Sequence, residues 1–86
     1  MTLDEKAIAW TEAWADRSRR AELTEEAKAI AAEHHAELAA TFEGLSGPDI
    51  VGYVEQARAD GDDAAVGRAN IWMIANLPKQ TVVGAA

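Results

Sequence analysis

A chain of 86 residues suits one domain with a thin hydrophobic core, and the absence of cysteine rules out disulfide or thiolate–metal support for that core. Fifteen acidic and eight basic residues give a net charge of −7, which argues against nucleic acid and anionic membranes as partners. No apolar run has the length of a membrane span. The first five residues include Asp4 and Glu5 and do not resemble a signal peptide, so we expect a cytoplasmic protein.

The first predicted helix covers residues 2–20. Thr2 and Glu5 have the spacing of a capping box, in which each side chain bonds the other residue's backbone at a helix start. Helical spacing then predicts a buried face formed by Leu3, Ala7, Trp10 and Trp14. Three arginines, at positions 17, 19 and 20, fall where this helix should end and would complement its dipole.

The second predicted helix covers residues 24–43, with Thr24 as its N-cap. Its apolar face is expected to hold Leu23, Ala27, Ile30, His34, Leu38 and Phe42. No glycine or proline separates the two helices, so one long helix is an alternative. However, the two apolar faces lie roughly 140° apart around a continuous helix, and we therefore expect a break near residues 21–24.

Two further helices are predicted at 48–60 and 63–77. Gly44 suits a left-handed helix end, while Ser46 with Asp49 should cap the next helix. The run 60–62 reads Asp-Gly-Asp and should end one helix and cap the other, and Pro78 stops the last one. The sequence thus predicts an all-α fold, a bundle of about four helices in residues 1–78 with a short non-helical tail at 79–86.

Residues able to carry catalysis or bind a metal are sparse. His34 and His35 point about 100° apart on a helix, so they cannot easily share a metal ion, and no nucleophile has an evident base beside it. We therefore predict no enzyme activity, no cofactor and no metal, with His34 in a structural role. The alternative is a small-molecule or metal-binding bundle with a pocket near His34 and the tryptophans.

The last helix suggests an interaction surface. Val66, Ala69, Met73 and Leu77 already supply one apolar stripe, yet further large side chains lie outside that stripe. The predicted surface consists of Arg68, Ile71, Trp72, Ile74 and Asn76, with Arg68 stacked on the Trp72 ring. We expect a small, acidic, non-enzymatic interaction module that forms a homodimer or docks on a larger protein partner, with no nucleic-acid or membrane contacts. In a competing account, the tail covers this surface within one chain.

Overall fold

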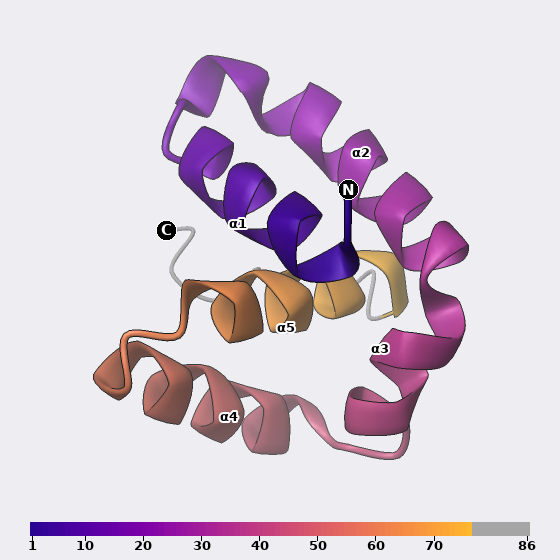
Figure 1. Cartoon of the computed structure of the whole chain (residues 1–86), viewed down its shortest axis with the longest axis vertical. Coiled ribbons are helices and arrows are strands. Elements are labelled where there is room, and N and C mark those ends of the chain that lie inside the picture. Colours follow the sequence, from indigo (N-terminus) through magenta and orange to yellow (C-terminus); the bar gives the residue numbers. More distant parts are fainter. Residues whose placement is uncertain (77–86) are drawn as a thin grey trace.

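The computed structural model describes residues 1–76, and over these residues the chain is all-α, as predicted. Five α-helices follow one another: α1 (Leu3–Trp14), α2 (Arg20–Glu33), α3 (His35–Phe42), α4 (Gly47–Ala59) and α5 (Asp63–Asn76) (Figure 1). A 3-10 turn, η1 (Arg17–Arg19), joins α1 to α2. The predicted tail at 79–86, together with Leu77 and Pro78, lies outside the described residues.

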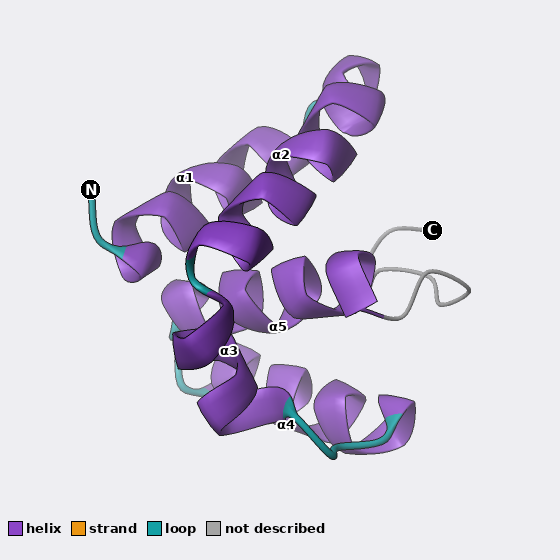
Figure 2. Ribbon diagram, turned by 90° about the vertical axis from the view of Figure 1, so that its right-hand side faces the viewer, coloured by secondary structure: helices purple, strands orange, loops and turns teal. Residues whose placement is uncertain are grey.

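The helices pack in layers around α5. Helices α1 and α2 lie side by side on one side of α5, α4 lies on the other side, and the short α3 links α2 to α4 (Figure 2). Helix α5 contacts each of the other four α-helices. None of the helices within residues 1–76 combines the length and apolar character needed to cross a bilayer.

The break between the first two helices exists, but it lies earlier than residues 21–24. Helix α1 ends at Trp14 because Asp16 accepts hydrogen bonds from the backbone N–H and hydroxyl of Ser18, which favours a turn over further helix. Arg20 also donates to the Trp14 carbonyl oxygen, which the end of α1 leaves unpaired. Thr24 is consequently not an N-cap: it lies inside α2, and its hydroxyl donates to the Arg20 carbonyl oxygen.

The helix predicted at 24–43 is divided in two, which makes five α-helices rather than four. His34 has φ −112° and ψ 29°, outside the helical range, and it separates α2 from α3. The apolar face survives this kink, since Leu23, Ala27, Ile30, Leu38 and Phe42 are all buried. Periodicity could not locate the break because the same face continues on both sides of it.

Apart from Thr24, the predicted helix caps at the starts of α1, α4 and α5 are confirmed. Capping boxes form between Thr2 and Glu5 at α1 and between Ser46 and Asp49 at α4, with Pro48 in the first turn of α4. Gly44 has a φ of 88° in the turn after α3. Asp62 Oδ1 accepts from the Ala65 N–H at the start of α5. Local chemistry therefore fixes the starts of α1, α4 and α5.

Candidate functional site

The side chains predicted to form an exposed surface on α5 are in fact largely buried. Ile71 is 0% exposed, Trp72 7% and Ile74 9%, so the expectation that these three lie outside the core is wrong. The physical reason is that four short helices suffice to surround α5, in part because its small residues allow close approach. At Gly67 an added Cβ would lie only 2.5 Å from the Ala7 carbonyl oxygen.

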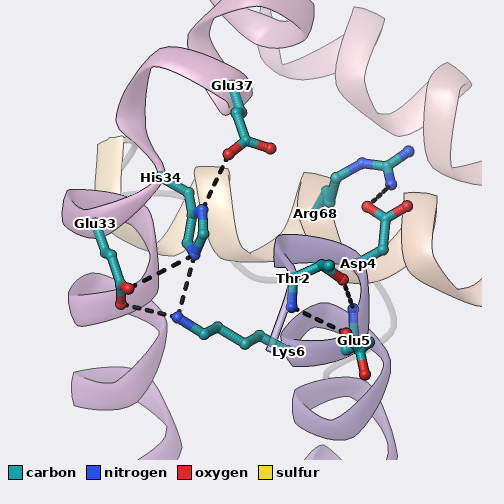
Figure 3. Close-up of polar contacts among 8 residues, drawn as sticks. All are labelled: Thr2, Asp4, Glu5, Lys6, Glu33, His34, Glu37 and Arg68. Atoms are coloured by element: carbon teal, nitrogen blue, oxygen red, sulfur yellow. Dashed lines mark hydrogen bonds and ion pairs between the residues drawn. The ribbon is translucent and has the colours of Figure 1, made fainter.

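The polar members of that predicted surface have partners within the chain. Arg68 forms an ion pair with Asp4 of α1 (Figure 3). It does not stack on Trp72 as predicted, and the Asn76 side chain donates to the Trp72 carbonyl oxygen. The Trp72 ring instead stacks on His35 at a centroid distance of 5.9 Å. Of the five predicted residues, only Asn76 is exposed to solvent. Helix α5 therefore provides no exposed apolar surface for a partner within the described residues.

His34 lies in a polar cluster that joins α1 to the α2–α3 kink (Figure 3). Lys6 Nζ lies 3.2 Å from His34 Nε2 and 2.9 Å from a carboxylate oxygen of Glu33, while His34 Nδ1 lies 3.2 Å from Glu37 Oε1. Since an ammonium group can only donate, Nε2 accepts and the ring proton sits on Nδ1, which donates to Glu37. These contacts tie the α2–α3 kink to α1 through Lys6.

The same cluster does not form a metal site. Glu33 and Glu37 approach opposite nitrogens of the His34 ring, so the three groups do not converge on one point. Within residues 1–76, no three side chains of the types that bind metals gather in a suitable group.

An open groove lies between α1 and α2. It has a volume of about 300 Å³, and we call it the α1–α2 groove; its lining residues are Met1, Lys6, Ala9, Glu26, Ala29, Ile30 and Glu33. Alanines from both helices give it a shallow apolar floor, and the Lys6–Glu33 ion pair crosses it from α1 to α2. Its dimensions are at the small end of those found for ligand-binding clefts.

A second groove of about 310 Å³ lies where α2, α3 and α5 meet. Its lining residues are Lys28, Ala31, Ala32, His35, Ala75 and Asn76. Neither of these two grooves is lined by His34 or by a tryptophan. They therefore do not correspond to the ligand pocket that the sequence suggested as an alternative. Trp10 is instead buried, and its indole Nε1 donates to the Leu23 carbonyl oxygen at 2.9 Å.

The net charge is negative because fifteen acidic side chains outnumber eight basic ones, and several of the bases are also paired within the chain. Ion pairs within the chain join Lys6 to Glu33, Arg19 to Glu22, Lys28 to Glu25 and Arg68 to Asp4. The hydrogen bond and charge of Lys6 hold the pKa of the Glu33 carboxyl below its ordinary value of 4.5. Hydrogen bonds from Thr2 likewise lower the pKa of Glu5. Both groups therefore remain ionised at neutral pH.

Comparisons with protein-family models, with curated proteins and with solved structures find no match to this chain.

Sequence reasoning missed the α1–α2 groove and the residues on its floor. Ala9 and Ala29 lie just beside the apolar stripes of their helices, and alanine is common on both buried and exposed helix faces. A groove between two helices depends on how far apart they pack, which no spacing along one chain segment encodes.

Proposed function

We propose that this chain is a non-enzymatic interaction module that docks on a basic surface of a larger protein. The observation that carries the proposal is the excess of exposed carboxylates left after the internal ion pairs form. Glu26, for example, is exposed and makes no ion pair among residues 1–76. Such a surface attracts cationic partners and accelerates their association.

The hydroxyl groups support a role without catalysis. Ser46 and Thr2 accept from backbone N–H groups at helix starts, and Ser18 donates to Asp16. A nucleophile needs an adjacent base and a site where a reacting atom can sit. These three hydroxyls serve helix ends and turns instead. The proposal also keeps the predicted cytoplasmic location, on the ground that the sequence contains no cysteine.

Docking on another protein is favoured over self-association. The apolar side chains that motivated a homodimer through α5 are buried in the chain's own core. Two copies with a net charge of −7 each would also repel one another. We therefore expect the isolated chain to sediment as a monomer of 9.2 kDa at high micromolar concentration.

The test is affinity isolation with the tagged chain from the cells that produce it, followed by reconstitution with the purified partner. The expected partner has a basic surface, and calorimetry should show an affinity that falls steeply as salt is raised. A partner bound through an acidic or uncharged surface, or an affinity that is independent of salt, would contradict the proposal. A stable homodimer without any other partner would favour self-association instead.

A further inference from the structure

We propose that His34 is a pH-sensitive switch between α1 and the α2–α3 kink: its ring holds Lys6 while the Nε2 atom is unprotonated and releases Lys6 when that atom takes up a proton. The observation that carries this inference is the contact of an ammonium group with an imidazole nitrogen from another helix (Figure 3). The switch does not depend on the proposed partner.

The contact between Lys6 and His34 requires an unprotonated Nε2 atom. Lys6 Nζ lies 3.2 Å from Nε2, and an ammonium group can only donate, so the ring nitrogen must contribute its lone pair. A proton on Nε2 would occupy that lone pair and would place two positive charges at the same distance. The side chains of Lys6 and His34 are only 21% and 14% exposed, so water screens this repulsion incompletely. The contact therefore cannot persist when the ring is protonated.

The cluster offers the protonated ring two other partners. Glu33 Oε1 lies 4.0 Å from Nε2 and Glu37 Oε1 lies 3.2 Å from Nδ1, so both N–H groups of an imidazolium have a carboxylate within reach. Lys6 keeps its ion pair with Glu33 Oε2 at 2.9 Å. Protonation thus exchanges a contact between α1 and His34 for a contact between His34 and its neighbour in the chain.

The charged groups beside the ring come from three helices. Lys6 belongs to α1, Glu33 to α2 and Glu37 to α3, so one positive charge faces two negative charges. The hydrogen bond and charge of Lys6, followed by the charges of His34 and of the Met1 α-amino group, hold the pKa of the Glu33 carboxyl below its ordinary value of 4.5. Histidine has an ordinary pKa of about 6.5. Glu33 therefore stays ionised over the range in which histidines titrate.

Helix α5 also packs on α2 and α3, but it adds no charge to the cluster. Its ionisable side chains among residues 63–76 are Asp63 and Arg68, and neither forms an ion pair with His34 within the described part of the chain. Arg68 pairs with Asp4 of α1 instead. The response of the ring is consequently set by Lys6 and the two carboxylates that contact it.

The kink is a place where the loss of one contact can change the structure locally. His34 has backbone angles outside the helical range, and no side chain caps the start of α3 there. From α1, Lys6 bonds both residues at this joint, Glu33 and His34. When His34 releases Lys6, α3 keeps its contacts with α2 and α5 but loses this link to α1. We therefore expect α3 to open more readily at low pH while the other helices stay folded.

The test is nuclear magnetic resonance of the whole chain between about pH 5 and 8. Proton–nitrogen correlation spectra of the rings report which nitrogen of His34 carries the proton. At the high-pH end the proton should lie on Nδ1, and the shifts of the Lys6 side chain should follow the titration of the ring. Amide exchange, corrected for its intrinsic pH dependence, should show protection in α3 falling about threefold or more on protonation, and protection in α4 changing less than about twofold.

Two substitutions remove the switch in different ways. In His34→Gln, the side-chain oxygen can accept from Lys6 and does not titrate. In Lys6→Met, the ring has no ammonium group to release. Both variants should make the protection of α3 independent of pH over this range. The matched control is His35→Gln, which removes the neighbouring histidine, whose ring stacks on Trp72, and should keep the pH dependence of the wild type.

Three outcomes would overturn the inference. A His34 ring that carries its proton on Nε2 at high pH could not accept from Lys6. Protection of α3 that stays constant while the ring titrates would show that the contact does not hold α3. If the pH dependence survives in His34→Gln and Lys6→Met, or disappears in His35→Gln, a group other than His34 is responsible.

Discussion

At Gly67, α5 packs closely against α1. A Cβ at this position would lie 2.5 Å from the Ala7 carbonyl oxygen and 2.6 Å from Thr11 Oγ1, distances at which the backbone of α1 would have to move. The Thr11 hydroxyl itself donates to the Ala7 carbonyl oxygen, which ties both atoms to the same helix. Here glycine is required by packing, since its φ is not in the left-handed region.

Gly67→Ala should therefore lower the free energy of unfolding by about 1–2 kcal/mol, as overpacking outweighs the better helix propensity of alanine. Gly52→Ala is the control, because a Cβ there meets no atom within 4 Å in the middle of α4. It should raise stability by about 0.5–1 kcal/mol. Urea denaturation followed by circular dichroism measures both. Equal stabilisation by the two substitutions would show that α1 and α5 do not approach this closely.

Asn70 is the one polar side chain among the buried residues of α5. It is 4% exposed, and its Oδ1 atom has no hydrogen-bond donor. A buried acceptor without a partner costs roughly 1–3 kcal/mol. Asn70→Leu should accordingly raise the thermal midpoint, since it exchanges that acceptor for an apolar group of similar size. A lower midpoint would mean that the amide contributes a contact that leucine cannot replace.

At the scale of the elements, the helix ends follow local chemistry while the joints between helices depend on contacts from elsewhere. The capping boxes at α1 and α4 involve residues three apart. The α2–α3 kink, in contrast, is held to α1 by Lys6, which lies 28 residues from His34. Lys6 also forms an ion pair with Glu33, the last residue of α2, so the same side chain holds both residues at the kink to α1.

The pKa of Glu33, lowered by Lys6, predicts a pH dependence with a definite sign. A carboxyl with a lowered native-state pKa stabilises the fold fully above its unfolded-state value of about 4.5, and the contribution is lost as the pH falls through the native-state value. The stability difference between the wild type and Glu33→Gln should thus shrink on acidification. In a Lys6→Met background, the same substitution should have an effect that varies much less with pH. Chemical denaturation at several pH values measures both series, and a difference that grows on acidification would contradict the assignment.

At the scale of the whole molecule, α5 is the centre of the core. Nine of its positions are buried, and its side chains meet α1, α2, α3 and α4. An apolar helix of this kind is either central or part of an interface, and a chain of 86 residues proves long enough for the first arrangement. A domain of this size has a total stability of only about 4–13 kcal/mol.

Ile71→Glu should therefore unfold the chain, because it places an unpaired charge at a position that is 0% exposed. The matched control is Ile8→Glu on α1, where the side chain is 37% exposed and the stability change should stay within about 1 kcal/mol. Far-ultraviolet circular dichroism distinguishes the two variants directly. If the Ile71→Glu variant keeps the helicity of the wild type, Ile71 lies at the molecular surface, and a homodimer through α5 becomes the better interpretation.

The sequence by itself determined the helical class, the helix starts at Thr2 and Ser46, and the buried stripes, because these depend on propensity, capping and periodicity over a few residues. It also determined the charge on which the proposed partner depends. Only the tertiary structure decided which further faces of α5 are covered, where the second helix kinks, and where a groove remains open. These features depend on the distances between helices, which no short stretch of sequence encodes. An apolar side chain such as Ile71 is equally compatible with burial in its own chain and with burial against a second chain, so its residue type could not distinguish the two.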